Sequence, residues 1–324
     1  MKNRISTILL CSAALLAAGA LQLWGQAATS AYAPPRTAWG DPDIQGQWPT
    51  VTMIPLQKRL PGQAGKGGGK GGAKGKGAAK GGQGPQRPAD VNNAPPPTQA
   101  QLVVDPPDGR IPDLTPEGAK RRLEARDGRG IPAEWREEAD TPEDMNLYYR
   151  CITRGLLGSI LASSYNNGNQ ILQIPGYVVI RHEMIHETRI IPLDGRPHVD
   201  NKIRMYMGDS RGHWEGNTLV VTTTNMTDKT SVGSNGAGYN GEGGIHSAAL
   251  KLTERFTRTA ENTLQYEATL DDPKTWSKPW TLAFPMTADP EYRMEEYACH
   301  EGNYAMENIL TGHRIEEEQG VKKK

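Results

Sequence analysis

The chain has 324 residues, of which 36% are hydrophobic and 23% are charged, and its formal net charge is +0 at pH 7. This balance averages regions of opposite sign. Lys2 and Arg4 contribute +2 and the eight basic residues from Lys58 to Arg87 contribute +8 with no acid among them, so the remainder carries −10. Because nucleic-acid-binding domains usually present a basic face, the acidic remainder argues against nucleic acid as a partner.

The first 27 residues are predicted to be a secretory signal peptide. Basic residues precede an apolar run from Ile8 to Leu23, and Gly25-Gln26-Ala27 is a small-x-small cleavage site. Small and polar residues interrupt the run, which favours a cleaved signal over a membrane anchor, and no later segment is apolar enough to span a bilayer. We therefore expect a periplasmic or secreted protein, cleaved near Ala27, with no transmembrane segment.

Cleavage leaves Cys151 and Cys299 as the two cysteines of the mature chain. In an oxidising compartment such a pair normally forms a disulfide, which we predict here. The alternative is that Cys299 and His300 act as nucleophile and base. Adjacent residues on a strand point to opposite faces, which argues against that alternative.

Residues 28–61 are expected to form an N-terminal segment with the first strand. Residues 62–97 are rich in Gly, Lys and Pro and cannot bury enough apolar surface to offset their ordering entropy, so they are predicted to be a disordered insertion. Weak contact with the anionic envelope is one hypothesis for the lysines of this insertion, which are Lys66, Lys70, Lys74, Lys76 and Lys80. No aromatic residue is interleaved with them, so a solvated linker is the simpler interpretation.

Residues 98–150 are predicted to be a peripheral helical segment. Thr115 suits an N-cap, Pro116 suits the first turn, and the residues that follow favour helix until Gly128. A shorter helix is expected over residues 132–139. Both helices are rich in charged side chains, so we expect them on the outside of a larger β structure.

Residues 151–310 are predicted to be a β domain, followed by a flexible tail at 311–324. Apolar and polar residues alternate in short runs bounded by turn residues, which is the pattern of antiparallel strands with one buried face. The expected strands are 171–174, 177–191, 218–225, 248–257, 263–270, 280–285 and 293–298. The sequence thus predicts a mainly β fold, either an antiparallel lipocalin-like barrel or a bent sandwich, with one or two peripheral helices.

Two stretches of the β domain are expected to be loops. Residues 209–216 look irregular, and residues 235–244 are glycine-rich with no following helix, so they do not resemble a phosphate cradle. The second stretch is expected to be a mobile loop that delivers His246 to the next strand.

The residues His182-Glu183-Met184-Ile185-His186 spell the H-E-x-x-H motif of zinc peptidases. On a helix both histidines can bind one metal, whereas on a strand the same four steps span roughly 13 Å. β-branched residues flank the motif, and neither an N-cap nor a glycine stop frames a helix, so a strand is predicted. In that strand His182 and His186 face inward and Glu183 faces outward.

The two histidines are therefore candidates for a ligand pocket or are structural histidines. A zinc site at His182 and His186 is the less favoured interpretation, because the downstream third ligands that can be nominated, His198 and Glu215, do not stand at a known family spacing. No cofactor is predicted.

Four further residues are candidates for the pocket. Glu254 has the inward phase of its strand, and a buried carboxylate must either be paired, here with Arg211 or Arg189, or have its pKa raised, which would make it a site residue. Aromatic side chains that could form a ligand platform, or could simply be core, are Tyr266, Trp214 and Trp280, with Trp276 nearby.

Seven segments resemble a large family of exported bacterial proteins of unknown function. They are TAWGDPDIQGQW, VDPPDGRIPDLTPEG, RCITRG, PGYVVIRHEMIHETRIIPLDGRPH, MGDSRGHWEGNTLVVTTTNMTDKT, LTERFTRTAENTLQYEATLDDPKTWSKPW and EYACHEGNYAMENIL. The chain departs from the family pattern at residues 58–97, where the Gly/Lys-rich insertion replaces helical sequence. Gly46-Gln47-Trp48 is also similar to the Gly-x-Trp that opens lipocalin-like (calycin) barrels, which implies a barrel fold.

Three functions are compatible with the sequence. The first is an exported protein that binds a small, partly apolar ligand in a β-barrel cavity. The second is a periplasmic hydrolase or other enzyme that uses His182, His186 and Glu254, with a zinc peptidase as its least favoured form. The third is an envelope interaction protein that acts through the basic insertion.

Overall fold

The computed structural model describes residues 32–58, 99–124, 141–145, 147–163, 165–230, 232 and 246–320. The predicted signal peptide, the insertion 62–97, the second helix 132–139 and the loop 235–244 lie outside the described residues. The chain divides into two compact units, Met1–Tyr32 and Ala33–Lys324, and the description below concerns the second.

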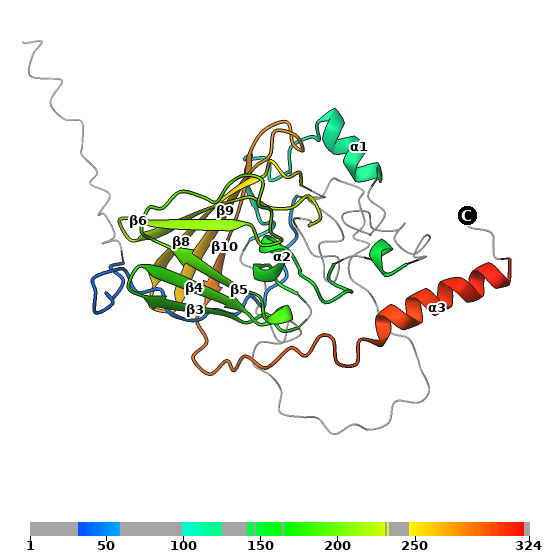
Figure 1. Cartoon of the computed structure of the whole chain (residues 1–324). Helices are drawn as coiled ribbons and strands as arrows, with labels where there is room; N and C mark the ends of the chain where they lie inside the picture. Colours follow the sequence, from blue (N-terminus) through cyan, green and yellow to red (C-terminus); the bar gives the residue numbers. More distant parts are fainter. Residues whose placement is uncertain are drawn as a thin grey trace, which may run out of the picture. The chain divides into compact units, whose positions relative to one another are not determined.

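The described strands form two antiparallel sheets (Figure 1). The four-stranded sheet has the order β1 (Gly46–Gln47), β3 (Asn169–Ile174), β4 (Tyr177–His182) and β5 (Thr188–Pro192). The six-stranded sheet has the order β2 (Val103–Asp105), β10 (Trp280–Thr287), β9 (Thr263–Asp271), β8 (Lys251–Ala260), β7 (Thr218–Thr224) and β6 (Asp209–Glu215). The predicted mainly β, antiparallel fold is confirmed. Two sheets are consistent with a sandwich, and the lipocalin-like barrel is not confirmed.

One hydrophobic core joins the two sheets. Val178 and Ile180 on β4 are buried with the alternate residues of β8 and β9, as the period of two predicts. The ring of Tyr266 lies at the centre of the core, with centroid distances of 5.0 Å to Phe256 and 5.2 Å to Phe284. The inward faces of both sheets are therefore filled by side chains from several strands.

The described residues contain few helices. They are α1 (Pro116–Glu124), α2 (Leu156–Ile160), α3 (Tyr304–Glu318) and the 3₁₀ turns η3 (Pro142–Asp144) and η4 (Met184–His186). Thr115 Oγ1 accepts a hydrogen bond from Gly118 N at 3.0 Å, so the predicted cap of α1 is present. Figure 1 shows α1 and α3 outside the strands. No helix in the described part of the chain is both long and apolar enough to cross a membrane.

The sequence did not predict α3, because these residues were assigned to the end of the β domain and to a flexible tail. The helix begins just after the disulfide. Asn303 at its start donates a hydrogen bond to Tyr149 O at 2.7 Å, which ties the helix to the segment before Cys151. Most of its side chains are exposed, so it offers little apolar periodicity for a sequence pattern to detect.

One predicted strand is absent, and one predicted loop is a strand. The expected strand 293–298 pairs with no other described strand, and Glu295 N instead donates to the side chain of Glu183. Residues 209–215, expected as a loop, form β6. The pattern missed β6 because Trp214 is the one large apolar residue in its inward phase, and the other inward positions are Ser210 and Gly212. A Cβ at Gly212 would lie 2.7 Å from Leu193, so glycine allows β5 and β6 to approach.

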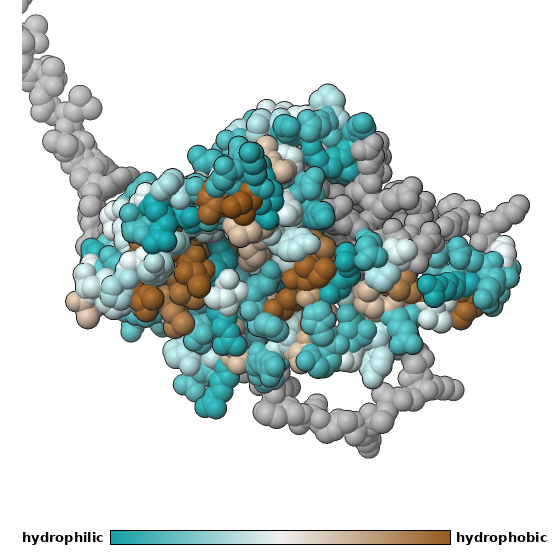
Figure 2. All heavy atoms as spheres, viewed as in Figure 1, coloured by the Kyte–Doolittle hydropathy of each residue, from teal (hydrophilic) through white to brown (hydrophobic). Residues whose placement is uncertain are grey.

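The outer face of the four-stranded sheet is partly apolar. Leu172, Ile174 and Ile190 are 44%, 53% and 64% exposed, and Leu172 and Ile190 lie in one cross-strand row through Val179. Figure 2 shows brown, apolar surface over this region.

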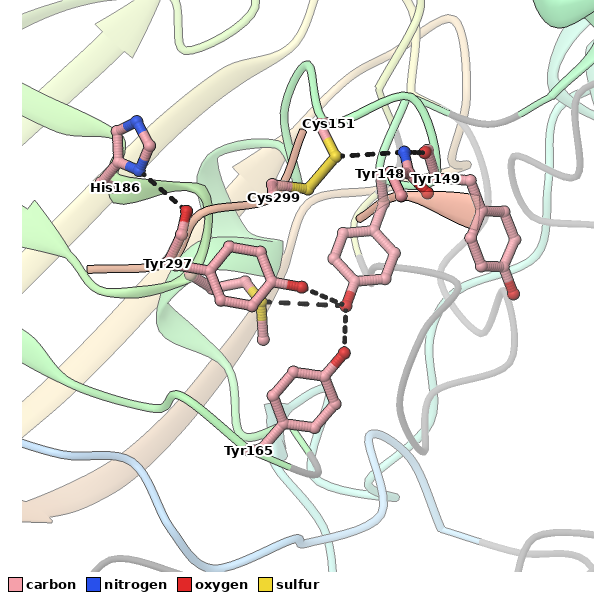
Figure 3. The surroundings of a disulfide bond; sticks show 9 residues. Tyr148, Tyr149, Cys151, Tyr165, His186, Tyr297 and Cys299 are labelled. Atoms are coloured by element: carbon pink, nitrogen blue, oxygen red, sulfur yellow. Dashed lines mark hydrogen bonds between the residues drawn. A yellow bond between two sulfur atoms is a disulfide. The ribbon is translucent and has the colours of Figure 1, made fainter. Parts of the chain in front are cut away.

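The predicted disulfide joins Cys151 to Cys299 across a sequence separation of 148 residues, with a Cα–Cα distance of 5.7 Å (Figure 3). It holds the segment after β10 against the segment that precedes α2.

We expect the double variant Cys151→Ser/Cys299→Ser to lose up to about 5 kcal/mol of folding free energy, because the unfolded chain regains the entropy of a very long loop. Urea denaturation measures the loss. Wild-type protein under reducing conditions should give the same curve as the double variant. Equal midpoints for the oxidised wild type and the variant would contradict the prediction.

Candidate functional site

His182 is the last residue of β4 and is completely buried. Its Nδ1 lies 2.7 Å from Asn169 Oδ1 on the neighbouring strand β3. Burial lowers the pKa of His182 to about 3, and the nearby cations Arg189 and Arg154 act in the same direction. The ring is therefore neutral at physiological pH. Because the Asn169 oxygen can only accept, Nδ1 carries the proton of this bond.

His186 lies on the other side of a turn. The strand ends at His182, and the chain passes through η4, where Ile185 and His186 have φ values of 58° and 43°. The His186 side chain is exposed, with Nδ1 3.2 Å from Tyr297 O (Figure 3). The predicted single strand 177–191 is thus wrong at residues 183–187, where the chain turns before it continues as β5, and His186 does not face inward.

The H-E-x-x-H residues are neither on an α-helix nor on one continuous strand, so one histidine is buried and the other is exposed. His198, the suggested third ligand, instead lies 2.8 Å from Asp209 through its Nδ1. Within the described residues no three His, Cys, Asp or Glu side chains are grouped as a metal site.

Glu183 was expected to face outward but is only 1% exposed. Its carboxylate accepts hydrogen bonds from Gly168 N at 3.0 Å, Glu295 N at 3.1 Å, Asn166 Nδ2 at 3.1 Å and the hydroxyl of Tyr292. A buried carboxylate needs such donors, and collecting them requires the chain to leave the strand direction here. Glu183 therefore anchors the loop before β3 and the segment after β10.

Glu254 is completely buried and pairs with Arg189, which settles the choice between the two arginines. Arg189 donates to Glu254 Oε1 at 3.0 Å and to Oε2 at 2.5 Å. Tyr266 donates to Oε1 at 2.9 Å, and Ser210 accepts from Arg189 at 3.3 Å. Burial alone would lower the pKa of Arg189, but the Glu254 carboxylate raises it above its ordinary value. The pair is charged and links β5 of one sheet to β8 of the other.

The remaining aromatic candidates form no open platform. Trp280 is completely buried and contacts Trp276 edge to face, with a centroid distance of 5.5 Å. Trp214 on β6 is half-buried and packs against the hydrophobic core. Tyr266 is buried beside Glu254.

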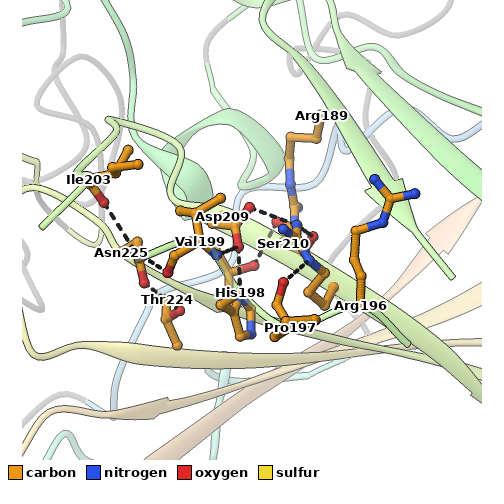
Figure 4. Close-up of polar contacts among 12 residues, drawn as sticks. Arg189, Arg196, Pro197, His198, Val199, Ile203, Asp209, Ser210, Thr224 and Asn225 are labelled. Carbon is orange, nitrogen blue, oxygen red and sulfur yellow. Dashed lines mark hydrogen bonds and ion pairs between the residues drawn. The ribbon is translucent and has the colours of Figure 1, made fainter. Parts of the chain in front are cut away.

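Asp209 and Asn225 fix the loop between β5 and β6 (Figure 4). Asp209 accepts from Val199 N at 3.1 Å and from Arg211 at 2.6 Å in addition to its contact with His198. Asn225 Nδ2 donates to three carbonyl oxygens, those of Val199, Asp200 and Ile203. These polar side chains position backbone and leave no group aimed at a cavity.

A cluster of tyrosines lies beside the disulfide (Figure 3). The Tyr148 hydroxyl is 3.0 Å from that of Tyr165 and 3.5 Å from that of Tyr297, and the Arg154 guanidinium lies 5.5 Å from the Tyr148 ring centroid. Burial raises the pKa of Tyr148, so it stays protonated. This cluster was not predicted from the sequence, although Tyr148 and Tyr297 lie within three residues of the cysteines that were predicted to pair.

One cleft is bounded by two separate segments, the one that follows β1 and the end of β10. Its volume is about 260 Å³. Its lining is mostly apolar with a few threonines and one carboxylate, and consists of Pro49, Thr50, Val51, Thr52, Ile54, Phe284, Pro285, Thr287, Ala288 and Asp289. None of the six predicted pocket residues lines it.

His182 is nevertheless connected to the wall of the cleft. Asn169, whose Oδ1 contacts His182, donates from Nδ2 to Thr50 Oγ1 at 3.1 Å. Thr50 N in turn donates to Asn167 O at 3.0 Å. The neutral histidine therefore supports the segment that lines the cleft without reaching the cleft itself. The sequence pattern that could have predicted this wall is the alternation of threonine and apolar residues at positions 50–54, shortly after Gly46-Gln47-Trp48.

Removing one member of the buried ion pair leaves the other charge unpaired, so Glu254→Gln should cost about 3–5 kcal/mol in urea denaturation. The double variant Arg189→Met/Glu254→Leu should cost less than the sum of its single variants, because it removes both charges. Arg196→Met, which breaks an exposed ion pair with Asp194, is the control and should leave the midpoint almost unchanged. Additive losses in the double variant would contradict a coupled pair.

His182 also predicts a pH dependence. An unfolded histidine has a pKa of about 6.5, whereas folded His182 has one of about 3. Between these two pKa values the unfolded chain therefore binds a proton that folded His182 does not bind. The contribution of His182 to folding stability is complete above pH 6.5 and falls by about 1.4 kcal/mol per pH unit as the pH drops. His182→Gln should flatten the curve between about pH 6 and pH 4 by this amount. A wild-type slope in His182→Gln would refute the assignment.

No protein-family model, curated protein or solved structure matches the chain. The resemblance of the seven segments to a family of exported proteins stays a prediction.

Proposed function

We propose that the protein binds a small, partly apolar molecule in the cleft between residues 49–54 and 284–289. The observation that carries the proposal is the composition of the cleft wall, which combines six apolar residues with three threonines and a single aspartate. Small-molecule sites generally have this character, mostly apolar with a few placed polar groups. The volume of about 260 Å³ favours a ligand smaller than a typical drug molecule.

The proposed ligand site is not the barrel cavity expected from the sequence. The space between the sheets is occupied by the hydrophobic core and by the Arg189–Glu254 pair. His182, Glu254 and Tyr266 are completely buried, so a substrate would have to displace packed side chains to reach them. Binding in the cleft is therefore better supported than catalysis by the predicted residues.

Export is part of the same proposal. The predicted signal peptide and the disulfide both support a periplasmic or secreted location, because structural disulfides persist in oxidising compartments. A ligand-binding protein in that location would meet small molecules taken up from outside or released across the envelope.

Native mass spectrometry of protein isolated from its own cells tests the proposal. We expect a retained small molecule in the wild type and its loss in Ala288→Trp, because the indole would fill the cleft. Leu172→Trp, which places the same ring on the exposed outer face of β3, should retain the ligand. Equal retention in both variants would place the ligand elsewhere and contradict the proposal.

A further inference from the structure

Asp289 is the one charged side chain among the residues that line the cleft. Its backbone N donates to Gln47 O at 3.0 Å, which ties it to β1, and its Oδ1 accepts from Glu291 N at 3.0 Å. These two bonds fix the carboxylate at the end of the apolar wall. Within the described part of the chain no Lys, Arg or His forms an ion pair with it.

We propose that the ligand of this cleft carries a cationic head, and that it is a small alkyl ammonium compound held by Asp289. This inference rests on the proposed function and names the ligand class for the same cleft. A partly buried carboxylate beside apolar side chains attracts a cation more strongly than one in bulk water. An anionic ligand would meet Asp289 without any basic side chain in the lining to offset the repulsion.

The hydroxyls of the lining suit an ammonium group as well. An ammonium presents three donors and no acceptor. Asp289 is the carboxylate of the lining, and Thr52 and Thr287 are hydroxyl-bearing residues of the same lining, whereas Thr50 Oγ1 already accepts from Asn169 Nδ2. Val51, Pro285 and Ala288, which are less buried than the other apolar residues of the lining, can contact an alkyl chain. At the ~30 Å³ that a water molecule occupies, the cleft has room for roughly eight non-hydrogen atoms.

A matched series of ligands tests this inference on the unmodified protein. Hexylamine, 1-hexanol and hexanoate share one alkyl length and differ in the charge of the head group. Calorimetric titration near neutral pH should show hexylamine binding at least about tenfold more tightly than 1-hexanol, because a charge-assisted hydrogen bond is stronger than a neutral one. Hexanoate should bind most weakly.

Variants then assign the preference to Asp289. Asp289→Asn keeps the acceptor for Glu291 N but removes the charge, so it should bind 1-hexanol as wild type does and lose the preference for hexylamine. Glu291→Gln, which removes an exposed neighbouring charge outside the lining, should keep that preference.

The possible outcomes separate the two proposals. Equal affinities for hexylamine and 1-hexanol, both abolished by Ala288→Trp, would overturn the cationic preference and leave the cleft as a binding site. A hexylamine preference that survives Asp289→Asn would also overturn the inference. Absence of any binding that Ala288→Trp abolishes would overturn both.

Discussion

The buried ion pair between Arg189 and Glu254 is the constraint on which the rest of the structure depends. Both side chains are almost completely shielded from water, at 2% and 0% exposure, so each must find the other and its remaining partners during folding. Arg189 belongs to the four-stranded sheet and Glu254 to the six-stranded sheet. The pair thus fixes how β5 lies against β6 and β8, and Ser210 and Tyr266 each add one further hydrogen bond to it.

The same pair explains the conformation of the H-E-x-x-H residues. Val178, Ile180 and His182 face inward on β4, but on β5 the inward residues are Arg189 and Ile191. Even-numbered residues face inward before the turn and odd-numbered residues after it, so the chain must change phase in between. The turn η4 makes this change, with Ile185 and His186 in the left-handed region. Burial of Glu183 and exposure of His186 follow from that turn.

Two buried or partly buried carboxylates, those of Glu183 and Glu187, hold neighbouring loop segments together. Glu183 accepts hydrogen bonds from the backbone N of Gly168 and of Glu295. Glu187 accepts from the hydroxyl of Ser159 at 2.9 Å and from the hydroxyl of Thr153. Burial raises the pKa of Glu187 despite these donors. At Gly168 a Cβ would lie 2.6 Å from the Tyr292 ring, so only glycine lets the two loops meet. The segment that runs from Asp289 to Tyr292 is held in this way next to the wall that contains Thr50.

The sequence by itself determined the class of the fold and its local features. Period-two alternation predicted β7, β8, β9 and β10, Thr115 and Pro116 predicted the start of α1, and Cys151 and Cys299 were predicted to pair. The strands and the start of the helix depend on neighbouring residues in the chain. The disulfide could be predicted because only two cysteines follow the predicted signal peptide. Only the tertiary structure decided that His182 and His186 separate, that Glu183 turns inward, and that Glu254 selects Arg189 over Arg211. The cleft was also decided at that level, because its walls come from residues more than 200 positions apart. Burial and the partners of a charge depend on contacts between distant segments, which a local pattern does not encode.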